Sequence, residues 1–483
     1  MANISFFNAL QYHILYNKGI NLYGGTAMKT IHIEFSDERL ITPSGLVFVG
    51  QILGKSNFVK KINRAPISNE YLQKQIKNGD ILLTYIGMLC QGKPQYEAVR
   101  EMMDDPGYYK YALGIAYAIP SAETLRQRFD MIGDSLRGDI LQANIDMLRE
   151  MKIEPAALEN GYVPVDIDVT PFDNSKTKKE GVSRTYKGFD GYAPIMAYIG
   201  TEGYFVNTQL RVGKQHCQKE TPDFLRETIE LCRQLTDKPL LIRLDSGNDA
   251  SENIGIFMEE SYRYNNVSFI IKRNPRQESK EEWLASVKDC CTNIQKPRDG
   301  KTVYIGQTFR DVTYTLPNKT EKTAGIRTIY EITERTIDKH GQYFIVPDIE
   351  LDTYWTNLPL SDQNIIDLYH AHGESEQYHS EIKTDMDVER LPSGKFDSNK
   401  LVLELTIIAY NILRIVGQES LKKRDDPGRK KVRRRRIRTI ISNLMQFAGH
   451  LTEHAGRLVL SIGRSNRWRF TFKRIYDSFA SVS

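Results

Sequence analysis

Two aspartates, Asp168 and Asp245, stand at the ends of apolar runs of the kind that forms strands. The run VPVDIDVT, which contains Asp166 and Asp168, alternates apolar and acidic residues with the period of a strand. The run PLLIRLD ends on Asp245. Open sheets place their sites at the carboxyl ends of strands, so we expect the two carboxylates to converge. Paired carboxylates are hard ligands that can hold divalent metal ions for phosphoryl transfer.

A third carboxylate would complete a metal site, and the segment YHAHGESEQYHSEIKTDMDVER offers one. Tyr369, His372, Glu376 and Lys383 recur there at intervals of three, four and seven residues, which place them on one face of a helix. Such a face can bind a metal ion through Glu376 while Tyr369 and Lys383 hold a phosphate. A salt-bridged surface helix explains the same spacing, so spacing alone leaves the third ligand open. Glu374, Glu381, Asp385 and Asp387 are also available in the segment.

Composition and charge narrow the class of protein. The chain has 483 residues, 40% of them hydrophobic and 26% charged, which favours a globular catalytic domain with further modules over a disordered protein. Its five cysteines form no C-x-x-C pair, so we expect neither a disulfide framework nor a zinc site. The net charge of +5 is mild, but residues 421–438 read LKKRDDPGRKKVRRRRIR. Phosphate is the natural partner of such a run, although a solvated basic tail remains an alternative.

The N-terminal third reads as helical, because apolar residues between about Pro43 and Met151 recur at helix spacing. Within it, Ser121 can cap the helix AETLRQRFD, and we expect Arg126 and Arg128 on its surface. That helix fits either a groove-reading element of a helix-turn-helix or an ordinary helix of a bundle, and its spacing does not distinguish them.

The middle of the chain predicts a mixed sheet. Two strand candidates follow Asp168, in 192–200 and 204–212, and suggest an antiparallel meander. Helices and strands then alternate through 221–273, which indicates parallel strands with helices packed on them. Short strands between turns in 274–352 predict a mostly β insertion, after which strand 354–358 and a helix from Ser361 resume the alternation. The apolar stretch 401–416 is too short and too interrupted to cross a bilayer comfortably and reads as a core helix.

Together these motifs resemble a known family. The pattern Asp168-x-Thr170, then Asp245-Ser246-Gly247, then Tyr369-(two)-His372-(three)-Glu376-(six)-Lys383 is similar to the Asp, Asp and Glu motifs of insertion-sequence transposases with a Y-R-E-K signature. Within these, the chain resembles insertion-sequence family 1380 of the group four superfamily. The likeness runs from about His32 to the C-terminus and includes the LRVG turn, the TNLP strand and the basic tail.

The resemblance implies a ribonuclease H-like α/β fold with a mixed sheet, a β insertion, an N-terminal helical region and a basic, helical C-terminal tail. It implies two Mg²⁺ ions per site, replaceable by Mn²⁺, held by Asp168, Asp245 and Glu376, with Tyr369, His372 and Lys383 on DNA phosphate. The partners would be double-stranded DNA, as terminal inverted repeats and as target, and a second copy of the chain in a synaptic complex. We expect the protein in a prokaryotic cytoplasm, at the nucleoid, with no membrane partner.

The same resemblance divides the chain into five regions. They are a helical, DNA-end-binding region (1–155), the first part of the catalytic domain (160–273), the β-rich insertion (274–352), the second part of the catalytic domain (353–417) and a basic C-terminal region (418–483).

Two positions are ambiguous. His372 stands where the signature has Arg, and histidine cannot make the bidentate contact of a guanidinium. Asp166 shares a strand face with Asp168, which we prefer as the first ligand because it lies closer to the strand end and matches the D-x-T form. The alternatives to a transposase are a ribonuclease H-like nuclease or resolvase without strand transfer, and a catalytically inactive, transposase-derived DNA-binding protein.

Overall fold

A computed structural model describes residues 31–67, 75–264, 266–316, 319–423, 425–428 and 431–481. The chain divides into two units, Met1–Arg39 and Leu40–Ser483. The elements that position the candidate site all belong to the second unit.

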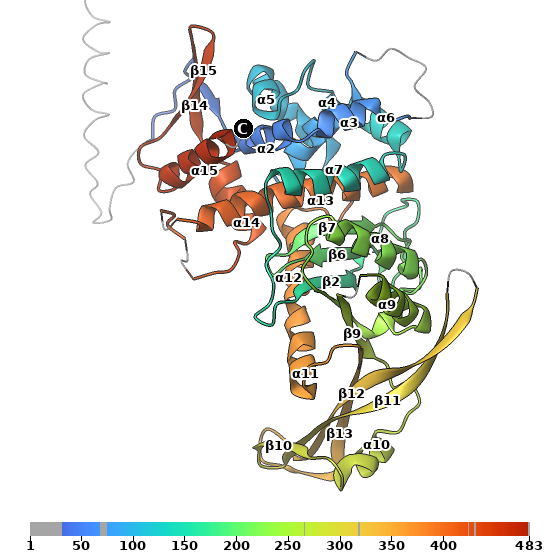
Figure 1. Ribbon diagram of the computed structural model, residues 1–483. Coiled ribbons are helices and arrows are strands. Elements are labelled where there is room, and N and C mark those ends of the chain that lie inside the picture. The colour runs from blue at the N-terminus through green and yellow to red at the C-terminus, as the bar shows by residue number, and fades with distance from the viewer. Residues whose placement is uncertain are drawn as a thin grey trace, which may run out of the picture. The chain divides into compact units, whose positions relative to one another are not determined.

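The N-terminal part of this unit is helical, as the apolar spacing predicts (Figure 1). Its elements are α2 (Leu46–Lys55), α3 (Phe58–Arg64), α4 (Asn78–Leu89), the 3₁₀ helix η1 (Tyr96–Met103), α5 (Pro106–Leu113), α6 (Ala122–Ile132) and α7 (Arg137–Glu150). The Ser121 hydroxyl accepts from the Thr124 N–H at 3.1 Å and caps α6 as expected. The surface position expected of Arg128 is wrong, because its guanidinium is buried and donates to the Ile76 carbonyl. Arg128 therefore takes part in the packing of the helical bundle and does not face solvent.

A mixed sheet forms the centre. Its first five strands are β2 (Val163–Val169), β6 (Ile195–Ile199), β7 (Tyr204–Gln209), β8 (Leu240–Leu244) and β9 (Val267–Arg273). Strands β2, β8 and β9 run parallel, while β6 and β7 continue from β2 as an antiparallel meander. Both features match the predicted pattern of meander followed by alternation. Three very short strands intervene between β2 and β6 as a separate small sheet: β3 (Phe172–Asp173), β4 (Ser183–Arg184) and β5 (Asp190–Tyr192).

Helices cover both faces of the sheet. Neighbouring residues of a strand point to opposite faces, and in β9 Phe269 stacks on Phe257 of helix α9 (Ser251–Tyr264), 5.1 Å between ring centroids. The next residue, Ile270, joins a buried cluster with Ile365 and Ile366 of helix α11 (Asp362–His370). Helix α8 (Thr221–Arg233) packs against α9. The face that carries Ile270 also carries the candidate acids, as described below.

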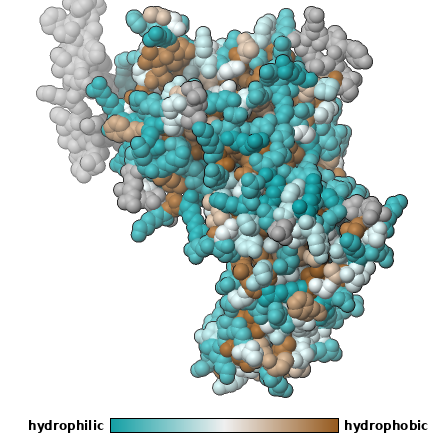
Figure 2. All heavy atoms as spheres, viewed as in Figure 1, coloured by the Kyte–Doolittle hydropathy of each residue, from teal (hydrophilic) through white to brown (hydrophobic). Residues whose placement is uncertain are grey.

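The β insertion has longer strands than the short ones that the sequence predicts, and these strands are continuous with the central sheet. It comprises α10 (Lys280–Lys288), β10 (Asn293–Arg298), β11 (Lys301–Thr315), β12 (Glu321–Ile337) and β13 (Tyr343–Thr356). The last residues of β13 pair antiparallel with β9, which produces one nine-stranded sheet of order β10-β11-β12-β13-β9-β8-β2-β6-β7. The strand expected at 354–358 is therefore the end of β13. The face shown in Figure 2 mixes hydrophilic and apolar side chains over this region, and the consecutive β13 residues Tyr343, Phe344, Ile345 and Val346 are among its exposed apolar residues.

The helix expected to carry the third carboxylate is not uniform. A 3₁₀ turn, η3 (Ala371–Glu374), follows α11, then come α12 (Ser375–Ser380) and a π turn, η4 (Glu381–Asp385). Gly373 lies inside the 3₁₀ turn, where a residue of low helix propensity weakens the regular α-helix. The prediction of one regular helix is therefore wrong in this detail, and the change of pitch alters which way the following side chains point.

The long helix α13 (Phe396–Leu421) is the core helix that the sequence predicts. Among the described residues it alone is long and apolar enough to span a membrane by length and composition, and 94% of its most apolar stretch is buried inside the protein. It lies beside α7 and on β7, although α7 is far away in the sequence (Figure 1).

The C-terminal region is not the purely helical tail that was expected. After α14 (Ile437–Ile440) and the π turn η5 (Ile441–Met445), strands β14 (Gly449–His454) and β15 (Arg457–Ile462) form a hairpin, and α15 (Arg469–Ser481) follows. The hairpin pairs with the short strand β1 (Arg39–Ile41) in a three-stranded sheet.

Candidate active site

The candidate acids come together because β2 and β8 are parallel neighbours. Their register sets Asp166 beside Arg243 and Ile167 beside Leu244. One step further along this register, at the carboxyl ends of both strands, Asp168 lies beside Asp245. Since side chains alternate between faces, Asp166 and Asp168 share one face with Arg243 and Asp245. The convergence expected of the first two carboxylates therefore follows from the strand pairing.

The two carboxylates influence each other's protonation. Burial and the negative charge of Asp168 raise the pKa of Asp245, whose Oδ1 accepts from Asn248 Nδ2 at 2.7 Å. Burial also acts to raise the pKa of Asp168, but His379 and the Val169 N–H lower it overall. Two partly buried carboxylates held side by side repel each other unless a proton or a cation lies between them. Their hard oxygens and their mutual repulsion fit a divalent cation.

One step back along the strands lies a buried polar cluster. The Asp166 carboxylate accepts from Arg243 Nε at 2.6 Å and from Arg243 Nη2 at 2.8 Å. His372 Nδ1, in η3, lies 2.9 Å from Asp166 Oδ1. Burial acts to raise the pKa of Asp166, but Arg243 and His372 lower it to about 2. Asp166 is thus already occupied by two basic side chains, which favours Asp168 as the metal-binding member of the pair.

His379 is a site residue that the sequence analysis missed. Its Nε2 lies 3.4 Å from Asp168 Oδ2, and its Nδ1 lies 3.3 Å from the Tyr198 hydroxyl. The imidazole is buried between the sheet and α12. The signal was present in the spacing, because residue 379 follows residues 372 and 376 at seven and three positions and so shares their helical face.

Glu376, the expected third ligand, is not brought to the two aspartates. Its side chain is exposed on α12. Within the described ranges no three acids, histidines or cysteines lie close enough together to hold a metal ion. The structure therefore assembles two of the three expected carboxylates and places the third on the adjoining helix.

The remaining predicted site residues lie around the acids. Tyr369 is half-buried, and burial followed by the charges of Asp245 and Asp168 raises the pKa of its hydroxyl. Lys383 Nζ lies 3.3 Å from Glu389 Oε1 and over the ring of Phe172.

Tyr186, which the sequence analysis did not single out, is near both acids. Its hydroxyl donates to the Val169 carbonyl at 3.0 Å. Burial, Asp168 and Asp245 together raise the pKa of that hydroxyl.

The basic segment of the C-terminal region contributes structural ion pairs next to this site. Glu381, in η4, is buried between Arg414 of α13 and Arg434, whose Nη1 lies 2.7 Å from Glu381 Oε1. The buried Asp385 accepts from Arg436 Nε at 2.8 Å, and its Oδ1 lies 3.3 Å from Arg438 Nε. Part of the predicted DNA-binding run is therefore committed to holding the π turn that contains Lys383.

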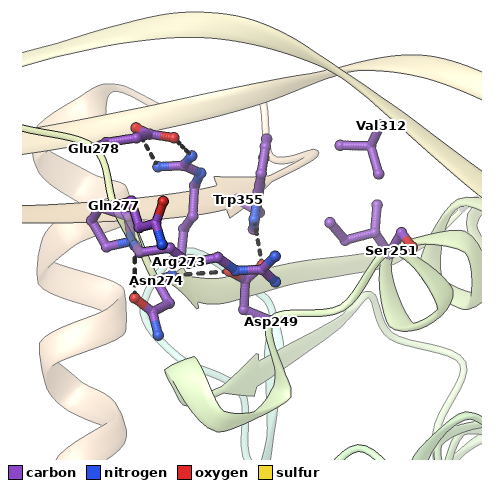
Figure 3. Close-up of a pocket in the computed structure, with 11 residues that line it drawn as sticks. Asp249, Ser251, Arg273, Asn274, Gln277, Glu278, Val312 and Trp355 are labelled. Carbon is purple, nitrogen blue, oxygen red and sulfur yellow. Dashed lines mark hydrogen bonds and ion pairs between the residues drawn. The ribbon is translucent and has the colours of Figure 1, made fainter.

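A cavity of about 670 Å³ lies beyond the turn that follows Asp245 (Figure 3). The Asp249 carboxylate accepts from Trp355 Nε1 at 2.8 Å and from the Asn274 N–H at 3.0 Å. Arg273 lies over the indole of Trp355 and pairs with Glu278. Trp355 is buried, in agreement with the packing role that is usual for aromatic residues.

The family model described as Transposase DDE domain group 1 matches residues 25–483. The comparison with proteins of curated function found no match. Seven chains of solved structures are similar. One is the cryo-EM structure of a piggyBac transposase synaptic complex with hairpin DNA, 12% identical over 90% of this chain and 84% of that chain, with a TM-score of 0.37.

Proposed function

Since the chain belongs to the DDE transposase family matched over residues 25–483, we propose that it cuts DNA at the terminal inverted repeats of its own element and joins the freed ends to target DNA. Within the family we propose that it is an insertion-sequence transposase with the Y-R-E-K signature and a ribonuclease H-like catalytic core. The meander followed by parallel strands supports that core.

The observation that carries the proposal is the pairing of Asp168 with Asp245. Two parallel strands present these acids side by side at their carboxyl ends, where burial and mutual charge raise the pKa of Asp245. A site that concentrates negative charge in this way is suited to divalent cations. When bound, two Mg²⁺ ions, or Mn²⁺ in their place, would supply the Lewis acidity that phosphoryl transfer needs.

We propose Glu376 as the third carboxylate. It lies between His372 and His379 in sequence, and those two side chains already contact Asp166 and Asp168. In a regular α-helix the three residues would share one face. The 3₁₀ turn η3 changes the pitch between His372 and Glu376, so α12 would have to turn to bring Glu376 to the acids. Closing of this kind on substrate is common in enzymes whose catalytic geometry tightens in the complex.

The chain's other residues would bind and orient DNA. Lys383 and Tyr369 are proposed to hold backbone phosphate beside the acids, Lys383 as a point charge and Tyr369 through its protonated hydroxyl. Double-stranded DNA is the proposed partner, with two copies of the chain in a synaptic complex, at the nucleoid of a prokaryotic cell.

The test is cleavage and joining of a labelled duplex that contains the DNA flanking the gene, with Mg²⁺ or Mn²⁺. We compare the native protein with Glu376→Ala and with Glu374→Ala, a matched control that removes an exposed acid two residues away. Nicking at a repeat boundary followed by joining, lost in Glu376→Ala and retained in Glu374→Ala, is the expected result.

Other outcomes point to the alternatives. Cleavage without joining would replace the transposase with a nuclease or resolvase. Binding of the ends without any cleavage by the native protein would leave an inactive, transposase-derived DNA-binding protein. Loss of activity in Glu374→Ala and not in Glu376→Ala would move the third ligand to Glu374.

A further inference from the structure

We propose that Asp166, Arg243 and His372 form a positioning cluster that anchors the segment leading into the Glu376-bearing helix to the strands that present Asp168 and Asp245. This inference rests on the proposed function, in which Glu376 completes the metal site. It assigns His372 a different role from the phosphate contact that the sequence resemblance implies.

Each residue of the cluster lies a few positions before one of the proposed ligands in the sequence. Asp166 precedes Asp168 by two residues in β2, and Arg243 precedes Asp245 by two residues at the end of β8. His372 precedes Glu376 by four residues, one helical turn away. A displacement of any one of these segments would therefore move its ligand and disturb the contacts of the cluster at the same time.

The contacts leave little freedom within the cluster. Arg243 binds both oxygens of Asp166 and donates from Nη1 to the Leu368 carbonyl in α11 at 2.8 Å. A carboxylate can only accept, so the proton of the 2.9 Å contact belongs to His372 Nδ1. Two independent contacts, one to the Leu368 backbone and one to the His372 side chain, therefore fasten the helical segment to the two catalytic strands.

The three side chains of the cluster are buried, so their geometry must compensate for the loss of solvation. The side chains of Asp166, Arg243 and His372 are 4%, 3% and 10% exposed. Removal of charged groups from water is costly, and a buried pair repays that cost only when its geometry is good and its remaining polar atoms are bonded. With Nδ1 engaged and the ring enclosed, His372 is poorly placed to bind a DNA phosphate.

The place of His372 in the chain explains why its anchoring matters. It lies in the 3₁₀ turn between α11 and α12, where the rotation per residue differs from that of an α-helix. The orientation of every side chain in α12, Glu376 included, depends on how this turn is held. Fixing residue 372 against Asp166 therefore provides the fixed point from which α12 can turn Glu376 toward the acids when metal or DNA binds.

The experiment compares the full-length protein with His372→Leu and His372→Asn. Asparagine can place an N–H donor where His372 Nδ1 lies, and leucine cannot. Mn²⁺ affinity is measured without DNA from the free-ion paramagnetic resonance signal. We expect His372→Leu to weaken Mn²⁺ binding by about 10- to 100-fold and His372→Asn to remain close to native, as is typical when a group that orients a ligand is lost or retained.

DNA provides the second readout. Under the positioning role, the single-turnover cleavage rate of His372→Leu falls by roughly 10²-fold, the effect of a misplacement of about 1 Å. The affinity for the element end and its salt dependence stay native. A fall in DNA affinity with about one fewer ion released, and native Mn²⁺ affinity, would instead identify a phosphate contact and overturn the inference.

Two further variants keep the result decisive. Arg243→Lys retains the charge beside Asp166 but loses the bidentate contact, so it should weaken Mn²⁺ binding even if His372→Leu does not fold. Arg137→Gln, which removes a contact to Glu227 between α7 and α8, is the stability control and should bind Mn²⁺ as the native protein does.

Equal loss of Mn²⁺ affinity in His372→Asn and His372→Leu would show that only the packing of the imidazole ring matters and would overturn the inference. A native protein that never cuts its ends defeats the proposed function, whereas native cleavage with an unimpaired His372→Leu defeats only this inference.

Discussion

At the scale of single residues, the protein contains two kinds of buried carboxylate. Asp166 and Glu381 lie against arginines that stabilise their charge. Asp245 and Glu404 lie beside other acids, and burial followed by the neighbouring negative charge raises the pKa of each. A buried carboxylate of the second kind lowers the stability of the fold as the pH rises through its unfolded pKa. Asp245 has a proposed catalytic reason for that cost, whereas Glu404, in α13, has none that the structure reveals.

Glu404 therefore predicts a pH dependence of stability. Burial and then Asp134 raise its folded pKa well above the usual value. As the pH rises past the pKa of the unfolded chain, the unfolded state releases a proton that the folded state retains, so stability falls by up to about 1.4 kcal/mol per pH unit until the folded pKa is reached. We expect Glu404→Gln to match the native protein near pH 4 and to be more stable at pH 7.5.

Urea denaturation at the two pH values measures this difference. A Glu404→Gln variant that is equally stable, or less stable, at pH 7.5 would show that the carboxylate is ionised and stabilised in the fold.

At the scale of elements, the C-terminal basic run has two populations of arginine. Arg434 and Arg435 are largely buried and paired with carboxylates, whereas Arg433 is exposed. The pairs with Glu381 and Asp385 hold η4, which follows the helix of the proposed third ligand. The basic residues of this run therefore have two roles. Some of them hold η4 in place, and we propose that the others bind DNA.

A matched pair of variants separates the two reasons. Arg434→Met leaves Glu381 with one fewer buried partner, and loss of one partner of a buried ion pair costs about 3 kcal/mol. We expect a clear loss of stability with Arg434→Met and almost none with Arg433→Met. In DNA-binding titrations at several salt concentrations, Arg433→Met should reduce the salt slope by roughly one. Equal destabilisation by the two variants would contradict this division.

Much of the arrangement of elements could be predicted from the sequence, because it depends on local patterns. The alternation around Asp168, the position of Asp245 after an apolar run and the Ser121 cap are all set by near neighbours. Arg243 could not be identified in the same way, since its role depends on which strand lies beside β2. The spacing of His379 placed it on the face of His372 and Glu376, but its contact with Asp168 depends on how α12 is rotated. The hairpin β14–β15 was missed because the run of arginines before it suggested a solvated tail.

At the scale of the whole molecule, the C-terminal elements complete the core of the N-terminal helices. Phe48 of α2 lies 4.6 Å from Phe472 of α15, ring to ring, and Phe447 lies at the same distance from Phe472. The Gly45 N–H donates to the Met445 carbonyl at 3.0 Å, and a Cβ on Gly45 would lie 2.1 Å from the Leu444 carbonyl oxygen. This approach requires glycine. The helical N-terminal part and the C-terminal region of the second unit are thus one packing unit, although the sequence resemblance divides them into separate regions.

Two phenylalanines of α15 test this packing. Phe472 is buried, and Phe470, two residues earlier, is 64% exposed. We expect Phe472→Ala to lower the free energy of unfolding by about 3 to 5 kcal/mol, as loss of a buried aromatic side chain does, and Phe470→Ala to change it little. Guanidinium denaturation of the two variants decides the matter. A native-like Phe472→Ala would show that α15 is dispensable to the helical core.

The repulsion between Asp168 and Asp245 has a consequence for the history of such a gene. A mutation that replaces Asp245 with asparagine would abolish the proposed chemistry and at the same time relieve a strain in the folded chain. Loss of activity at this position is therefore favourable for folding, and only selection for activity opposes it. Gene copies that are no longer under that selection are expected to lose activity while their proteins remain well folded. Such copies would persist in a genome as stable proteins that still bind DNA.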